Sequence, residues 1–198
     1  MWDLSPGKAF SRLATPTVLA STVVVVIAAA GVYFSLVSAP GPIGVLGAGL
    51  ALIMLAIAVI DLRSFIIPDV LNAAAAVLAI MHAAAQEPEA WLQAVGIAVL
   101  RGALLALVFF ALRAGYARWR GRQGLGLGDV KLAFVAGAWL DWLTIPIAIQ
   151  VAALGALSAY LVRYLVSGRS LSATSRMPFG LFLAPAIWIC WLLEVRWL

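Results

Sequence analysis

Long stretches without charged residues dominate this chain and restrict what it can fold into. Hydrophobic residues make up 65% of its 198 residues and charged residues only 11%, against roughly 45–50% and about 25% in soluble domains. A soluble protein of this size cannot build a core that buries such runs, whereas a bilayer accepts each run of about 20 apolar residues as one helix. The sequence therefore predicts an all-α integral membrane protein.

We expect a single polytopic domain over residues 1–198, with a bundle of about six to seven transmembrane helices. The fifth apolar run is short, and Pro146 separates it from the sixth. Residues 130–166 can therefore form two spans, one kinked span or a re-entrant piece. The seven runs lie at about 17–38, 43–60, 69–85, 91–112, 130–145, 145–166 and 178–195.

Basic residues flank these runs unevenly, and cytoplasmic loops of membrane proteins are enriched in Lys and Arg. With the amino terminus in the cytoplasm, nearly all cations fall on that side, and Arg196 is the exposed exception. The outer loops then carry His82, Glu87, Glu89 and Asp141. The cytoplasmic set is Lys8, Arg12, Arg63, Arg113, Arg118, Arg120, Arg122, Lys131, Arg163, Arg169 and Arg176.

Two aspartates stand at the ends of apolar runs, Asp61 after the second and Asp129 before the fifth. On the orientation above, both lie on the cytoplasmic side at similar depth. An aspartate at the centre of a membrane helix costs about 2.5–3.5 kcal/mol, so such residues usually serve a function. Judged by position alone, each of these aspartates is more often a residue that caps its helix. Two carboxylates that share one proton can, however, activate water and hydrolyse a peptide bond.

A glycine-rich segment precedes the second aspartate, with Gly124, Gly126 and Gly128 at alternate positions before Asp129. Glycines permit close approach of another chain, or backbone angles that other residues avoid. Such a segment could present an extended peptide to the carboxylate. We therefore include the glycines next to Asp129 among the candidate supporting residues.

Other polar residues have more than one interpretation. Pro68 and Asp69 are expected to end the connection after the second span and to N-cap the third. Lys131 is either a topological anchor or a partner for an aspartate or a substrate carbonyl. Arg101 lies in the middle of the fourth run and needs an acidic partner or a watery cavity. An interfacial position is expected for His82 and for Trp91, Trp139, Trp142, Trp188, Trp191 and Trp197.

Four short motifs then point to a known family. They are Asp61-Leu62-Arg63 with Ile67-Pro68-Asp69-Val70-Leu71-Asn72, then Gly126-Leu127-Gly128-Asp129-Val130-Lys131-Leu132, then Ala136-Gly137-Ala138-Trp139-Leu140, and Pro178-Phe179-Gly180 with Phe182-Leu183-Ala184. In this order they make the chain resemble the type IV prepilin peptidases, within the intramembrane proteases that carry a glycine-x-glycine-aspartate motif. The resemblance runs from about residue 43 to the carboxyl end, so the run at 17–38 is an additional span.

The resemblance implies a function and a site. Asp61 and Asp129 would be the catalytic pair of an aspartic endopeptidase, with Gly126, Gly128, Lys131, Pro68 and Asp69 binding substrate or supporting the pair. The substrate would be a type IV prepilin or a related pseudopilin, cut after the glycine that ends its short basic leader. Cleavage would occur at the cytoplasmic face of a bacterial inner membrane, and the proposed chemistry needs no cofactor and no metal.

The chain departs from the larger members of the family in one respect. Those members resemble bifunctional enzymes, with a cytoplasmic segment of paired Cys-x-x-Cys motifs and an N-methyltransferase activity. Here only the short turn Ala39-Pro40-Gly41-Pro42 lies between the first two runs, and Cys190 is the one cysteine. We therefore expect a peptidase without methyltransferase activity.

An alternative function is that of a membrane transporter or proton-relay protein, which also places aspartates at membrane level. Such proteins typically show internal repeats and helices broken near the midplane, and the sequence shows no repeat. The basic cluster between Arg113 and Arg122 lacks the aromatic platform of a nucleic-acid-binding surface. The expected partners are the lipid bilayer and the protein substrate, and no nucleic acid.

Overall fold

The computed structural model of the chain describes residues 16–121, 124–167 and 178–197, and these residues form seven helices and no strand. The all-α prediction is confirmed for this part of the chain. The helices are α2 (Pro16–Ser38), α3 (Gly41–Ser64), α4 (Asp69–Gln86), α5 (Trp91–Arg120), α6 (Leu127–Trp139), α7 (Thr144–Ser167) and α8 (Gly180–Trp197).

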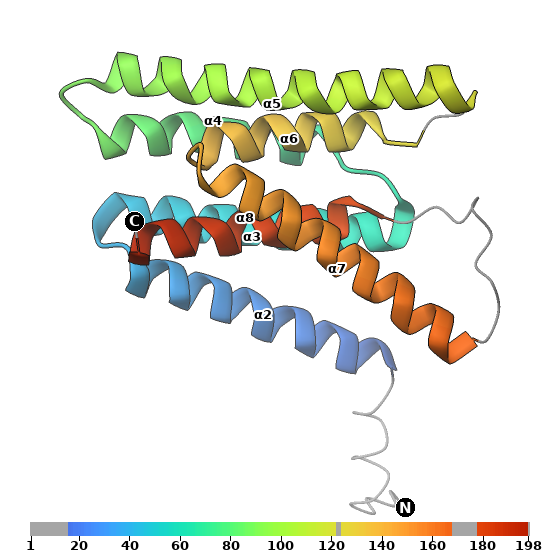
Figure 1. Ribbon diagram of the computed structural model, residues 1–198. Helices are drawn as coiled ribbons and strands as arrows, with labels where there is room; N and C mark the ends of the chain where they lie inside the picture. Colours follow the sequence, from blue (N-terminus) through green and yellow to red (C-terminus); the bar gives the residue numbers. More distant parts are fainter. Residues whose placement is uncertain (1–15, 122–123, 168–177, 198) are drawn as a thin grey trace, which may run out of the picture.

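Successive helices alternate in direction, so the bundle has two ends (Figure 1). The first, here called the Asp61 end, collects the carboxyl ends of α3, α5 and α7 and the first turns of α4, α6 and α8. The second, called the Asp141 end, holds the carboxyl end of α8 and the turn between α6 and α7. Asp61 and Asp129 therefore lie at the same end of the bundle, as the alternating spans predict.

Six of the described helices are long and apolar enough to cross a bilayer, and α6 is the exception. Its 13 residues reach only about 20 Å at 1.5 Å per residue, against a hydrocarbon thickness of about 30 Å. The chain then turns at residues 140–143, and α7 runs obliquely away from the bundle (Figure 1). Residues 130–166 are thus two separate helices. The break precedes Pro146, which lies within the first turn of α7.

Short α6 is held in place by close backbone contact with α5. A Cβ on Gly102 would lie 2.7 Å from the carbonyl oxygen of Phe134, and a Cβ on Gly137 would lie 2.6 Å from that of Arg101. Only glycine allows such an approach, and small residues at helix interfaces are typical of membrane bundles. This packing positions the first turn of α6, which carries Asp129.

The outward faces of the peripheral helices are apolar. On α2, Val25 is 65% exposed, and on α7, Val166 is 83% exposed. In water these side chains would destabilise the fold, whereas in a bilayer they contact lipid chains. The buried side chains instead cluster along α3, α6 and α8. The exposed apolar surface and the six long helices identify a membrane protein.

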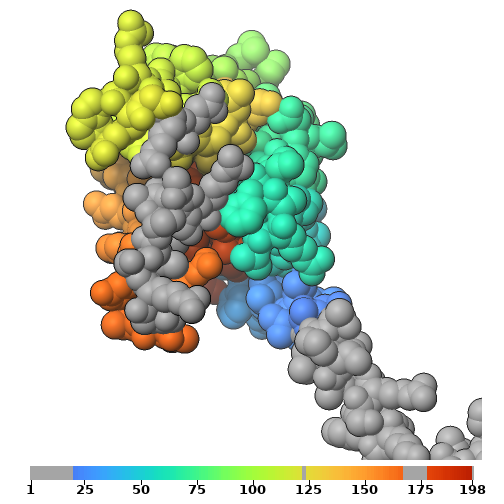
Figure 2. Space-filling model, turned by 90° about the vertical axis from the view of Figure 1, so that its right-hand side faces the viewer, coloured from blue at the N-terminus to red at the C-terminus, as the bar shows by residue number. Residues whose placement is uncertain are grey.

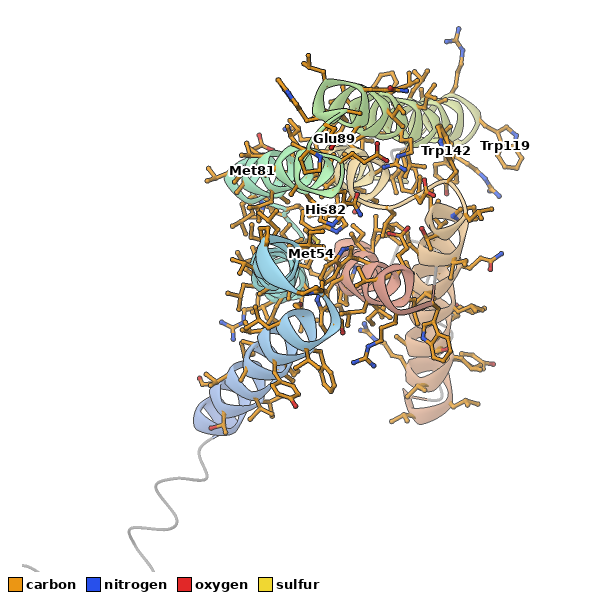
Figure 3. All side chains as sticks on the ribbon, turned by 90° about the vertical axis from the view of Figure 1, so that its left-hand side faces the viewer. Met54, Met81, His82, Glu89, Trp119 and Trp142 are labelled. Atoms are coloured by element: carbon orange, nitrogen blue, oxygen red, sulfur yellow. The ribbon has the colours of Figure 1, made fainter. Side chains whose placement is uncertain are left out.

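The interfacial prediction for His82 is wrong, because its side chain is only 1% exposed. It points into the bundle (Figure 3), where its ring stacks on Trp139 at 4.5 Å between centroids and its Nε2 accepts a hydrogen bond from Trp191 Nε1 at 3.1 Å. Both tryptophans are also buried, so the belt prediction fails for them. His82 follows the buried Ala75 at a spacing of seven residues, which places the two on one helix face.

Candidate active site

Asp61 lies one turn before the end of α3, with its side chain only 4% exposed. Its Oδ2 accepts the backbone N–H of Leu181 at 2.9 Å. Leu181 belongs to the first turn of α8, where unpaired N–H groups and the helix dipole favour a carboxylate. A Cβ on Gly180 would lie 2.8 Å from the same oxygen, so the glycine of the Pro-Phe-Gly motif leaves room for Asp61.

Asp129 is the third residue of α6, and its Oδ2 accepts the backbone N–H of Gly126 at 3.1 Å. The carboxylate therefore caps the helix, and the capping role coexists with its position in the site. Burial raises the pKa of Asp129 to about 6, the hydrogen bond from Gly126 lowers it, and the negative charge of Asp61 raises it. A carboxyl with such a pKa holds a proton more readily than an ordinary aspartate near neutral pH.

Both aspartates line one cavity of about 220 Å³ at the Asp61 end. Figure 2 looks onto this end, with the chain around residues 60–75 in teal beside the yellow start of α6 and the red of α8 deeper between them and α7. The cavity is lined by Asp61, Phe65, Ile66, Ile67, Asp69, Gly126, Leu127, Gly128, Asp129 and Lys131. Residues that are 68 positions apart in the sequence thus share one site.

All but one of the candidate site residues line this cavity, and Pro68 does not. Pro68 instead adopts an extended conformation as the N-cap residue of α4, and its carbonyl accepts the N–H of Asn72 at 3.2 Å. Phe65, Ile66 and Leu127 line the cavity without having been singled out in the sequence. Their proximity to the Asp61 and Asp129 motifs was the available signal. Apolar residues beside a membrane span, however, look the same in the sequence whether they line a cavity or contact lipid.

The expectation that Asp69 N-caps α4 is wrong. Asp69 is the first helical residue, and its Oδ1 accepts a hydrogen bond from Lys131 Nζ at 2.6 Å. Pro68 has the extended conformation of an N-cap residue, so α4 begins one residue earlier than expected. Residues two apart on a helix face different directions. Lys131 therefore binds Asp69 of α4 at the cavity wall, while Asp129 accepts the N–H of Gly126.

The glycine segment works by close approach and not by unusual backbone angles. Gly126 has φ −75° and ψ 155°, which any residue adopts. A Cβ on Gly128 would lie 3.0 Å from Ile67 Cβ, and one on Gly124 would lie 2.6 Å from the ring of Tyr116. Glycine at these two positions lets the start of α6 pack against its neighbours, and this packing closes one wall of the cavity.

The second span continues beyond Asp61, to Ser64, and ends at Phe65 in the left-handed conformation with φ 55°. The N–H of Phe65 donates to the carbonyl of Asp61 at 2.9 Å. A non-glycine residue in this region is uncommon and costs of order 1–2 kcal/mol. After this turn, Ile66 and Ile67 line the cavity.

Metal-binding chemistry finds no support in the geometry. Within the part of the chain that the structure describes, no group of three or more His, Cys, Asp or Glu side chains is arranged to hold an ion. Asp61 and Asp129 are both bonded to backbone N–H groups, and neither has a basic side chain as its hydrogen-bond partner among the contacts described.

The fold and the cavity define a polytopic helical membrane protein with a paired-aspartate site. The type IV leader peptidase family matches residues 48–162, more than half of the chain and a range that contains both aspartates. The chain belongs to this family.

Curated relatives agree with that assignment. The leader peptidase HopD of Escherichia coli is 40% identical over 88 residues, which are 44% of this chain and 56% of HopD. The prepilin leader peptidase/N-methyltransferase of Aeromonas hydrophila is 34% identical over 94 residues, 48% of this chain and 32% of that protein. The protein of the same name from Dickeya chrysanthemi is 34% identical over 132 residues, 67% of this chain and 44% of that protein.

The chain thus spans only part of the length of the relatives it matches, 56% of HopD and 32% of the Aeromonas hydrophila protein. No solved structure matches the chain.

Proposed function

We propose that this chain is an intramembrane aspartic endopeptidase that removes the leader peptide of type IV prepilins or pseudopilins. The observation that carries the proposal is the single cavity lined by both Asp61 and Asp129. Membership of the type IV leader peptidase family supports it, as do the printed names of the relatives, which are leader peptidases.

The chemistry follows from two carboxyl groups that share one proton. The ionised member of the pair takes a proton from a water molecule, and that water attacks the scissile carbonyl. The protonated member stabilises the developing oxyanion, and the leaving amine is protonated as the peptide bond breaks. The N–H groups of Leu181 and Gly126 hold Asp61 and Asp129 in place for these proton transfers.

The Asp61 end is proposed to face the cytoplasm of a bacterium, with the protein in the inner membrane. Exposed Arg63, Arg118 and Arg120 lie at this end, together with half-exposed Lys131. Glu87, Glu89 and Asp141 lie at the other end, which matches the enrichment of cations in cytoplasmic loops. Lys8, Arg12, Arg122, Arg169 and Arg176, which the sequence also assigns to the cytoplasmic side, lie outside the described residues.

Labelling tests the orientation. In a Cys190→Ser background, Ser64→Cys should react with a membrane-impermeant thiol reagent only when the cytoplasmic face is open to it. Ser64 is exposed at the end of α3, whereas a cysteine at Gly124 would collide with Tyr116. Labelling from the outer face alone would reverse the proposed orientation.

A peptidase without methyltransferase activity is proposed, because α2 and α3 are joined by Ala39 and Pro40 alone. A processed substrate should therefore leave this enzyme with an unmethylated amino terminus.

The direct test is co-expression with a candidate prepilin, followed by mass analysis of the new amino terminus. The expected product begins directly after the leader glycine and carries no added methyl group. The double variant Asp61→Asn with Asp129→Asn should yield only precursor, and Glu87→Gln with Glu89→Gln serves as a control with the same number of charges removed at the opposite end. Cleavage by the double aspartate variant would contradict the proposed function.

A further inference from the structure

Acidic side chains are distributed unevenly between the two ends of the bundle. At the Asp61 end, the described acidic residues are Asp61, Asp69 and Asp129, and all three line the cavity. The remaining described acids, Glu87, Glu89, Asp141 and Glu194, belong to the other end. The cavity is therefore the place at which negative charge gathers on an otherwise basic end.

Asp69 is more exposed than buried Asp61 and half-buried Asp129. Its side chain is 73% exposed at the cavity wall, whereas Asp61 is 4% exposed. Its partner in the free protein is Lys131, with Nζ 2.6 Å from Asp69 Oδ1 and a side chain that is 49% exposed. Ion pairs as exposed as this one contribute only about 0–1 kcal/mol. An arriving cation can therefore replace Lys131 on Asp69 at little cost.

The surrounding charge makes such a cation-binding residue necessary for a basic substrate. Exposed Arg63, Arg118 and Arg120 repel a positively charged peptide that approaches this end. Asp69 is the exposed acidic group in the cavity, and it lies in the same 220 Å³ space as Asp61 and Asp129. A side chain bound to Asp69 thus belongs to a residue near the bond that the pair attacks, because each extended residue spans about 3.3–3.6 Å.

We propose that Asp69 binds the basic side chain of the leader that lies closest to the cleaved bond, just before the leader glycine, and that Lys131 pairs with Asp69 only while no substrate is bound. The inference rests on the proposed function, since it assigns a specificity residue to that same cavity. Asp69 is then a substrate-binding residue, while Asp61 and Asp129 perform the reaction. Lys131, whose long flexible side chain is readily displaced, keeps Asp69 paired in the empty enzyme.

The test measures cleavage of three prepilin substrates that keep the leader glycine and differ only in the residue before it, which is lysine, glutamine or glutamate. Asp69→Asn should raise KM for the lysine substrate roughly tenfold with kcat nearly unchanged, the range expected for one charge-assisted contact, and should leave the glutamine substrate unaffected. Asp69→Lys should invert the preference, so that the glutamate substrate is cleaved better than the lysine substrate. Lys131→Met should lower KM for the lysine substrate or leave it unchanged.

Glu89→Lys, the same charge change at the exposed opposite end, is the matched control and should alter none of these ratios. Restored cleavage of the glutamate substrate by Asp69→Lys also proves that this variant is folded. Equal loss of kcat on all three substrates, or an unchanged preference in Asp69→Lys, would overturn the inference. Failure of the wild-type protein to cleave any of the substrates would instead overturn the proposed function.

Discussion

The two ends of the bundle both hold charged side chains, but the partners of those charges differ. At the Asp61 end, Asp61 and Asp129 accept backbone N–H groups in the part of the chain that the structure describes, and both line a cavity. At the Asp141 end, Arg101 forms an ion pair with Asp141. The backbone N–H of Asp141 and the hydroxyl of Thr144 both donate to Glu194 Oε1. We call these four residues, Arg101, Asp141, Thr144 and Glu194, the Arg101 cluster.

The comparison separates charges that stabilise the fold from charges that are available for chemistry. Arg101 is only 13% exposed, and its opposite charge on Asp141 compensates for removing the guanidinium from water. The sequence did not reveal which acid pairs with Arg101, since Asp141 is 40 residues away. Among the contacts described, Asp61 and Asp129 have no such basic partner, and acids at membrane level without a countercharge are candidates for a functional site.

The largest expected effect concerns the cavity. Asp61→Asn and Asp129→Asn should each reduce cleavage by at least roughly 1,000-fold, because each removes half of a pair that shares one proton. Neither variant should lower the thermal midpoint in detergent appreciably, since an amide still accepts the backbone N–H. Cleavage assays and melting curves on the same preparations check the expected loss of activity and the expected retention of stability. Substantial turnover by either variant would remove that aspartate from the mechanism.

The opposite result is expected at the Arg101 cluster. Arg101→Met keeps the long side chain but leaves Asp141 and Glu194 without the cation, and should lower the free energy of unfolding by about 1–3 kcal/mol, between the values for exposed and buried pairs. Activity per folded molecule should stay near that of the wild type. A thermal midpoint equal to that of the wild type would show that the cluster does not stabilise the bundle.

A smaller effect on activity alone is expected from Gly180→Ala. The new Cβ would lie 2.8 Å from Asp61 Oδ2 and 2.7 Å from Ile67 Cδ1, so the carboxylate must move. We expect kcat to fall roughly tenfold, because small displacements of a catalytic group have large effects on rate. Gly115→Ala is the matched control, since its Cβ would contact nothing within 4 Å. Equal kcat values in the two variants would contradict the assignment of Gly180 to the site.

The smallest effect concerns pH. Burial raises the pKa of Asp129 from 3.8 to about 6, so folding favours its protonated form. Stability from this group is full below pH 3.8 and is lost as pH rises through about 6. Asp129→Asn should therefore flatten the dependence of the thermal midpoint on pH between about 4 and 6. In the wild type, cleavage should decline as the shared proton is lost, with apparent pKa values that belong to the pair. A pH dependence of stability identical in both proteins would rule out this contribution.

Local sequence determined much of this protein. The length and low charge of the apolar runs are properties of the chain itself, and they predicted membrane helices because no water-soluble arrangement satisfies them. Alternation of the spans then predicted that Asp61 and Asp129 lie at one end. Their motifs, each confined to a short stretch of sequence, indicated the family. These conclusions needed no knowledge of which helices touch.

Tertiary structure decided the remainder, because it depends on contacts between residues far apart in the chain. That Leu181 binds Asp61, that Lys131 pairs with Asp69 and that Arg101 pairs with Asp141 could not be derived from spacing along one helix. His82 was misplaced for the same reason. A histidine near the end of a span is compatible with the interface or with the interior, and the partners on α6 and α8 determine which of the two environments it occupies.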